Sequence, residues 1–343
     1  MPYSTYKQLS SNARSWAKTF FSLIRSRARR SNAPKQLLTR KARRQGLRLA
    51  AGAFIGLVAW MPAPPVQAQI TFPSATPISA GNVIVREQPF MASGGEGYQT
   101  YQNQIVVVYG FTPNIAFVLD SNSYVYQTAR IQSTTESLQR SAMGFGNSQF
   151  VFRYTIMQED DIGSTLRVAP IVGADIPTWM DDQSDKYGRV PPSLQPGWGA
   201  WGPLLGNTFT WQTLDWMVAA DIVYQFNTAA EGYKFGNVFR VDGGFRYRLW
   251  PWPLRTGVPA EIYASLEANL INVAQDQAAG VVQPNTGGTS LFVDPGIIYT
   301  TAQWGVVLSA LLPAMQQLNG SAPLIHYEIL LLFRWSFFTP YHL

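Results

Sequence analysis

The chain has 343 residues, a formal charge of +6 and no cysteine, and 46% of its residues are hydrophobic. Residues 1–68 hold 13 Lys or Arg and no acidic residue, so residues 69–343 hold 13 basic and 20 acidic residues and carry a charge near −7. This balance removes the support for a nucleic-acid-binding protein, and the lack of cysteine excludes a disulfide framework.

The first 68 residues have the pattern of a secretory signal peptide with a long basic n-region. Arg43, Arg44 and Arg48 precede an uncharged run over 49–61, and Val66-Gln67-Ala68 is a small-residue cleavage box. A run of about 13 apolar residues is too short to span a membrane as a helix. We expect export with cleavage near Ala68–Gln69. An organelle transit peptide is the alternative, and the natural start could lie downstream of Met1.

A mature N-terminal lead over 69–80 precedes twelve predicted strands, and a C-terminal tail over 339–343 follows them. The strands are expected at about 81–91, 103–109, 115–126, 148–158, 165–177, 205–212, 215–226, 236–249, 260–272, 291–300, 304–313 and 325–338. The last strand is the clearest, because every odd position from Ile325 to Phe337 is apolar and Glu328 and Arg334 lie between them. Alternation over so many residues suits a tilted membrane strand, although a long strand of a soluble sheet has the same period.

The connections between these strands alternate in length. Long segments are expected at 92–102, 127–147, 178–204, 227–235, 273–290 and 314–324. Shorter ones are expected at 110–114, 159–164, 213–214, 250–259 and 301–303. Outer-membrane barrels have long outside loops and short periplasmic turns. The sequence therefore predicts an all-β protein, a transmembrane antiparallel up-and-down β-barrel of about 12 strands over 81–338 in the bacterial outer membrane.

Charged residues alternate with the apolar ones and are expected on the lumen side, since a charge facing lipid at mid-bilayer costs roughly 2–4 kcal/mol. These pore-lining candidates are Arg153, Arg167, Asp175, Asp221, Arg240, Asp242, Arg246, Arg248, Glu261, Glu267, Asp294, Glu328 and Arg334. They would select solutes in a pore, or simply pair with one another and close a narrow interior. Arg240, Arg246 and Arg248 are the best candidates for an anion-attracting patch.

The segment 178–204 is long enough for a functional loop. It contains Trp179, Trp198 and Trp201, which are candidates for a constriction inside the barrel or a docking site at its mouth. The alternative is a surface loop whose aromatic side chains rest at the membrane interface.

Several segments resemble a known family. The runs Leu291–Tyr299, Leu311–Pro313 and Phe333–Phe337, with Ala174–Thr178 and Tyr247–Trp252, are similar to those of the outer-membrane transporters of the MetA-pathway-of-phenol-degradation family. This resemblance implies a Gram-negative outer-membrane channel for small solutes, including hydrophobic or aromatic compounds. It brings no catalytic or binding residues. Members of such families end on a terminal Phe, whereas residues 339–343 follow Phe338 here.

Two other function classes stay open. An outer-membrane hydrolase, such as a phospholipase, needs a base beside a hydroxyl nucleophile, but the chain has only His326 and His342 and no GxSxG pattern, so we do not expect an enzyme. A structural or adhesive barrel is the third class. No cofactor, metal or nucleic acid is expected. The expected partners are outer-membrane lipid, a small-molecule solute and the barrel-assembly machinery.

Overall fold

The computed structural model describes residues 75, 78–132, 137–178, 181–254, 257 and 259–338. All of them belong to the unit from Trp60 to Leu343. The expected leader with its cleavage site and the tail at 339–343 lie outside the described residues. None of the described segments is a helix long and apolar enough to cross a membrane.

Twelve antiparallel strands close into one barrel, which confirms the predicted fold class. The strands are β1 (Asn82–Gly94), β2 (Gln99–Gly110), β3 (Ile115–Gln132), β5 (Ser148–Tyr154), β7 (Ser164–Ile176), β10 (Gly202–Thr213), β11 (Trp216–Gln225), β14 (Val238–Trp250), β15 (Ala260–Val273), β18 (Gly288–Thr301), β19 (Trp304–Leu318) and β20 (Ile325–Phe338). Each pairs with its neighbours in chain order, and β20 pairs with β1. Closure leaves no unpaired edge, which matters in lipid because no water is there to satisfy backbone groups.

The two faces of these strands differ as a membrane barrel requires. Side chains alternate along a strand, and Leu266 on the outward face of β15 is 53% exposed while the next residue, Glu267, is 3% exposed. On β19, Leu308 is 56% exposed and Ser309 is 2% exposed. An outer surface built from exposed large apolar side chains is unfavourable in water and favourable in hydrocarbon.

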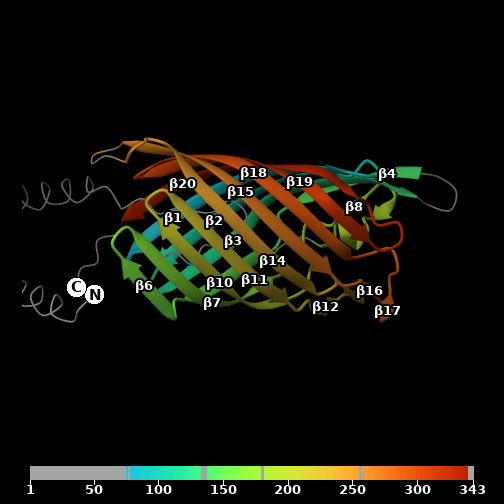
Figure 1. The fold of residues 1–343 in the computed structure, drawn as a ribbon. Helices are drawn as coiled ribbons and strands as arrows, with labels where there is room; N and C mark the ends of the chain where they lie inside the picture. The colour runs from blue at the N-terminus through green and yellow to red at the C-terminus, as the bar shows by residue number, and fades with distance from the viewer. Residues whose placement is uncertain are drawn as a thin grey trace, which may run out of the picture. The chain divides into compact units, whose positions relative to one another are not determined.

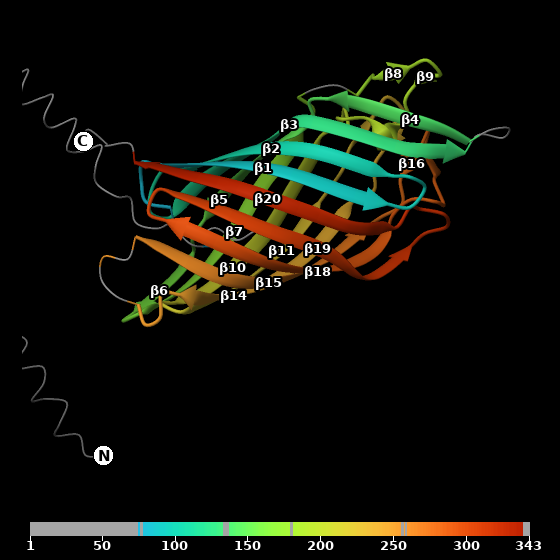
Figure 2. The same ribbon diagram turned by 90° about the horizontal axis from the view of Figure 1, so that it is seen from above.

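The barrel has two unlike ends (Figures 1 and 2). At the short-turn end β1 begins and β20 finishes, and β6 (Met157–Asp161) pairs with β7. At the long-loop end β4 (Ser137–Gly144) extends β3 beyond the barrel. The other short elements of that end are β8 (Ser184–Asp185), β9 (Gly188–Arg189), the 3-10 helix η1 (Pro192–Leu194), β12 (Ala229–Ala230), β13 (Tyr233–Lys234), β16 (Gln277–Ala278) and β17 (Val281–Val282).

The prediction of a long outside loop at 92–102 was wrong. β1 continues to Gly94 and β2 starts at Gln99, so the connection is a four-residue turn closed by a hydrogen bond from Tyr98 N to Gly95 O of 3.0 Å. Glu96 and Gly97 have φ of 52° and 64°. Two central residues with positive φ match the twist of a hairpin, and the glycine makes that conformation accessible at one of them.

Other expected boundaries also change. β19 runs on to Leu318, so the loop expected at 314–324 starts after that residue. Most of the loop expected at 127–147 is a hairpin, because β3 runs on to Gln132 and β4 pairs with it. The strand expected at 148–158 ends at Tyr154, and β6 begins separately at Met157. In these last two places the chain leaves the barrel wall and pairs beyond it, which a period-2 pattern does not reveal.

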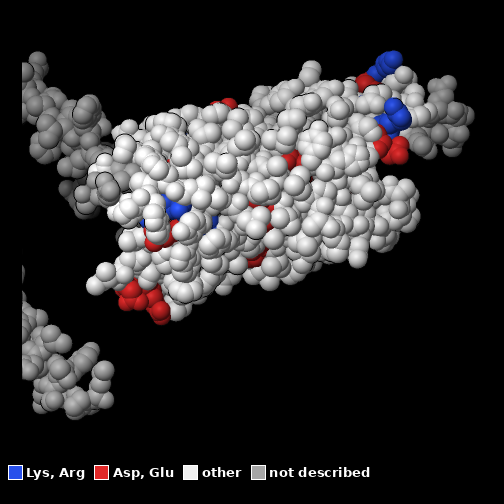
Figure 3. Space-filling model, turned by 45° about the horizontal axis from the view of Figure 1, so that its top comes forward, with Lys and Arg blue, Asp and Glu red and all other residues white. Residues whose placement is uncertain are grey.

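Aromatic side chains mark both rims of the outer surface. Trp211 and Trp216 meet edge to face at the short-turn end, with ring centroids 4.8 Å apart. Tyr224 and Phe226 do so at the long-loop end, at 4.5 Å. Rings with an apolar body and a polar handle favour the lipid–water interface. On the face in Figure 3, uncharged residues cover most of the wall and charged ones gather mainly toward the ends.

Candidate functional site in the barrel interior

All the charged residues expected to face the lumen lie on the inward face of their strands. Arg153, Arg167, Asp175, Asp221, Asp242, Arg246, Arg248, Glu267, Asp294 and Arg334 are buried, and Arg240, Glu261 and Glu328 are partly exposed. Arg248 and Asp242 are each only 1% exposed. These inward side chains are therefore packed closely against their neighbours on the barrel wall.

Arginines gather in the interior at the short-turn end. Six lie no more than four residues from that end of their strands: Arg86, Arg153, Arg167, Arg246, Arg248 and Arg334. Arg240 is not part of this group. It lies farther along β14 and donates from Nε to Asp242 Oδ2 at 2.5 Å. The expected patch of Arg240, Arg246 and Arg248 is thus divided between two levels of the barrel, because six residues along a strand span roughly 20 Å.

Some of these arginines are neutralised by carboxylates at the rim. Arg167 Nη2 lies 2.6 Å from Asp160 Oδ1 on β6. Arg248 pairs with Asp215 in the turn after β10 and lies 3.9 Å from Glu261. Hydrogen bonds from Thr165, Gln158 and Arg167 lower the pKa of Asp160 to about 2, which keeps this exposed carboxylate charged. These arginines therefore stabilise the rim of the barrel through their ion pairs.

Carboxylates form a separate level nearer the middle of the barrel. Asp221 and Asp242 face each other across β11 and β14, and Glu267 and Asp294 face each other across β15 and β18. Asn269 donates to Asp294 within the same level. Farther toward the long-loop end, Gln149 and Gln225 donate to Asp175 at 2.7 and 2.8 Å. The interior is thus basic at one depth and acidic at the next.

One side of the lumen wall is apolar. Ile298, Val307, Leu330 and Leu332 come from β18, β19 and β20, and Tyr263 joins them from β15. Phe90 of β1 and Leu311 of β19 pack against this group. These side chains have the same inward direction as the charged ones, so the interior offers an apolar strip beside its polar groups. We call this set the apolar wall.

The lead before β1 enters the barrel at the short-turn end. The backbone N–H of Ala75 donates to Thr210 Oγ1 of β10 at 2.9 Å, and neither residue has any exposed surface. Ile78 packs on the inward residues Ile84, Val106 and Ala116 of β1, β2 and β3. Ala75 and Ile78 therefore contact two separate parts of the barrel wall, β10 on one side and β1 to β3 on the other. The sequence predicted the lead but not this position.

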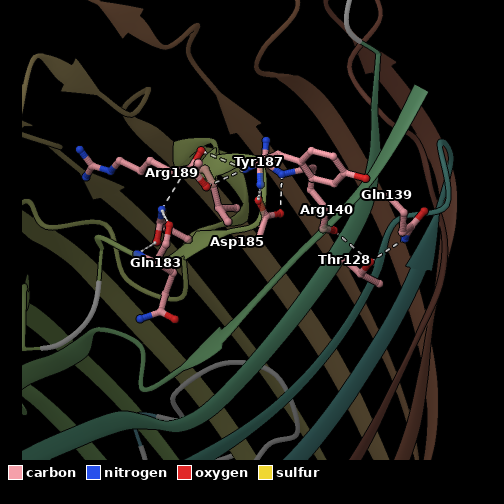
Figure 4. Close-up of polar contacts among 10 residues, drawn as sticks. Thr128, Gln139, Arg140, Gln183, Asp185, Tyr187 and Arg189 are labelled. Carbon is pink, nitrogen blue, oxygen red and sulfur yellow. Dashed lines mark hydrogen bonds and ion pairs between the residues drawn. The ribbon is translucent and has the colours of Figure 1, made fainter. Parts of the chain in front are cut away.

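The loop between β7 and β10 folds against the inner side of the β3–β4 hairpin. Val190 and Leu194 pack with Ala129 and Ala142, on the face that continues the inward face of β3. Arg140 of β4 donates to Asp185 Oδ2 at 2.5 Å and to the carbonyl oxygens of Gly188 and Arg189 (Figure 4). The hydrogen bond from Arg140 lowers the pKa of Asp185, so this tie persists over most of the pH range.

The tryptophans of this loop have separate surroundings. The ring of Trp198 stacks on Phe235 with ring centroids 5.2 Å apart, and the backbone N–H of Trp198 donates to Asn147 Oδ1 at 3.0 Å. Trp201 is 52% exposed; its backbone N–H donates to Thr228 Oγ1 at 3.0 Å, and that hydroxyl donates to the Trp201 carbonyl oxygen at 2.9 Å. Trp179 lies outside the described residues. The loop is anchored on the barrel, and its role as a constriction stays a prediction.

Sequence reasoning missed two inward charges, Arg86 and Asp120. On β1 the outward Glu87 breaks the alternation, and it accepts a hydrogen bond from the outward Asn103 at 3.3 Å. On β3 the inward neighbours of Asp120 include the apolar Ala116 and Val118, so both faces look alike. The pairing of β1 with β20 is the signal that would have identified Arg86, since it places this residue opposite Arg334.

His326, the candidate general base, is exposed and has no hydrogen bond to a hydroxyl within the described ranges. His342 lies outside the described residues. No group of three or more His, Asp or Glu in the described ranges has metal-binding geometry.

Comparison with known proteins identifies the architecture. No family model and no curated protein match the chain, so the resemblance to the MetA-pathway family stays a prediction. Among solved structures, a COG4313 outer membrane channel from Pseudomonas putida F1 matches with a TM-score of 0.54 and 11% identity, over 79% of this chain and 100% of that chain. A NanC porin matches with a TM-score of 0.41 and 13% identity, over 75% and 100% of the two chains, too slight a likeness for an argument. The chain therefore has the fold of a porin-like outer-membrane β-barrel.

Proposed function

We propose that this protein is a channel of the bacterial outer membrane that passes small solutes with an apolar or aromatic body by passive diffusion. The observation that carries the proposal is the interior: a closed barrel with an apolar outer surface contains an apolar wall beside charged groups. Such a wall lowers the cost of dehydrating an apolar solute, and the charged groups orient its polar part. The short-turn end faces the periplasm in this proposal, in line with the rule for outer-membrane barrels.

Three expectations from the sequence belong to the same proposal. The leader directs export and is removed near Ala68–Gln69, the barrel-assembly machinery inserts the chain, and the inward charged residues line the path. The loop with Trp198 and Trp201 narrows the path at the outer mouth. Support comes from the packing of this loop on the inner side of the β3–β4 hairpin.

Liposome swelling tests the channel. Purified mature protein in liposomes should admit small neutral solutes, and the rate should fall with solute size because the passage is narrow. Liposomes without protein are the control. Impermeable proteoliposomes that contain correctly folded barrels would contradict transport and favour a structural barrel. Phospholipid hydrolysis that is lost in His326→Ala would favour an enzyme.

The lipid-facing surface is tested by Leu266→Arg. This outward residue lies near the middle of β15. An arginine there should lower the free energy of unfolding from lipid by roughly 2–4 kcal/mol, because it places a charge in hydrocarbon. Leu266→Phe is the matched control and should change stability little. Equal stability of both variants in denaturant titrations would show that the face is not in lipid.

A further inference from the structure

Two arginines face each other in the barrel interior without a countercharge at ion-pair distance. Arg86 of β1 and Arg334 of β20 are directly opposite in the ladder. Within the described ranges neither makes an ion pair, and both have a buried guanidinium nitrogen without a hydrogen-bond partner, Nε of Arg86 and Nη1 of Arg334. Like charges placed opposite each other destabilise a sheet, and a buried donor without an acceptor has a further cost.

The surroundings of this pair add to its positive character. The charge of Arg334 is repelled by those of Arg86 and Arg246, and Arg153 is repelled by Arg86. The carboxylate that acts on Arg86 is Asp120 of β3, which does not reach it as an ion pair. Arg334 is held in place by Thr300, whose Oγ1 accepts from its Nη2 at 2.7 Å. The fold thus positions the pair without a carboxylate at ion-pair distance among the described residues.

Apolar side chains adjoin Arg334, one member of the pair. A cavity of about 20 Å³ lies between the two arginines Arg246 and Arg334 and the side chains of Ile298, Val307 and Leu332. This volume holds one water-sized group, such as a carboxylate oxygen. Leu332 is two residues from Arg334 on the same strand face, and Leu330 and Phe90 continue the apolar wall away from the short-turn end.

We propose that Arg86 and Arg334 form the anion subsite of the channel, and that its solutes are small monocarboxylates with an aromatic or short aliphatic body. The two guanidinium groups bind the carboxylate, since their planar forks match its two oxygens. The body of the solute lies on the apolar wall. A multiply charged, strongly hydrated anion would gain nothing from that wall. This assignment rests on the proposed channel function and names its solute class.

Charge-selective conductance tests the subsite with two probes that share one body, benzoate and benzylammonium. In planar bilayers, reversal potentials under a gradient of potassium benzoate or benzylammonium chloride give the two permeabilities. The wild-type channel should favour benzoate. The double variant Arg86→Gln/Arg334→Gln should lower the benzoate-to-benzylammonium ratio roughly tenfold, because two charge-assisted contacts are lost. Swelling rates with a neutral solute should stay unchanged.

Two controls separate charge from folding. Arg130→Gln removes one positive charge from an exposed position at the long-loop end and should leave the ratio unchanged. Arg86→Lys/Arg334→Lys keeps the charge without the planar fork and should restore part of the ratio. Heat-modifiable migration in gels and β-type circular dichroism show that each variant folds.

Each failure points to a different conclusion. A double variant that folds and passes the neutral solute but keeps the wild-type ratio overturns the subsite and leaves the channel intact. Calorimetric titration of benzoate into wild-type protein in detergent gives an independent readout. Binding that disappears in the double variant, in a protein that conducts nothing, would support the subsite and overturn the channel. Phosphate that binds as tightly as benzoate would overturn the assignment to monocarboxylates.

Discussion

The two ends of this barrel are closed in different ways. At the short-turn end Ala75 of the lead hydrogen-bonds to Thr210 inside the barrel, next to a level of buried arginines. At the long-loop end a loop packs on the β3–β4 hairpin and is tied to it by Arg140 and Asp185. The short-turn end is closed by backbone inside the barrel. The long-loop end is closed by a surface loop that a partly exposed ion pair holds in place. We therefore expect the lead to control whether solutes pass, and the loop at the long-loop end to have a smaller effect on their rate of passage.

Removal of the lead should have the largest effect on passage. A mature protein that starts at Ser79 lacks Ala75 and the apolar anchor Ile78, so the contacts of the lead with β10 and with β1 to β3 are lost. We expect a severalfold rise in single-channel conductance. A variant with Gly and Ser at 69–78 keeps the length and removes the packing, and it should show frequent opening. Conductance equal to that of the wild type in both variants would mean that the lead does not obstruct the path.

The outer closure should respond to Asp185→Asn. The variant loses the charge that Arg140 Nε contacts, and the loop should become slightly less stable on the hairpin, because an ion pair screened by solvent contributes little. Acrylamide quenching of tryptophan fluorescence should increase, and channel noise should rise. Lys186→Gln, in the same loop but outside this ion pair, is the control. Unchanged quenching would show that apolar packing of Val190 and Leu194 alone holds the loop.

Low pH should weaken the ion pair between Arg140 and Asp185. The pKa of Asp185 is lowered in the folded protein from its usual 3.8 by the hydrogen bond from Arg140. The stabilisation is therefore present above about pH 4, and it is lost as the pH falls through the lowered pKa. Loop exposure measured by fluorescence quenching should rise only in that acidic range. A transition near neutral pH would contradict this assignment.

The smallest effect is expected at the short-turn rim, where Asp160 accepts hydrogen bonds from Thr165 and Gln158. Its pKa is about 2, so its contribution is present above pH 4 and lost as the pH falls toward 2. Because the group is exposed, Asp160→Asn should change local stability by under about 1 kcal/mol. Amide exchange of residues 157–161 measures it, and conductance should not change. Altered conductance would mean that β6 takes part in closure.

Local patterns were sufficient for the strands but not for the turns. Ile325 to Phe338 was identified as one strand with both faces assigned, because alternation is a property of consecutive residues. The turn at 95–98 was missed because Ser93 and Gln99, which flank it, are polar and look like loop residues. The β3–β4 hairpin was missed for the same reason, since the end of β3 and the whole of β4 extend beyond the barrel wall and do not alternate cleanly between polar and apolar residues.

The sequence by itself determined the strand number and the inward face of the charged residues that it singled out, since the period of a strand and the cost of a charge in lipid are both local. It did not identify the inward Arg86 and Asp120. Closure of the barrel placed Arg86 opposite Arg334, which are far apart in the chain. The position of the lead inside the lumen also depends on closure, because β10 and β2 provide its contacts only once the sheet is a barrel.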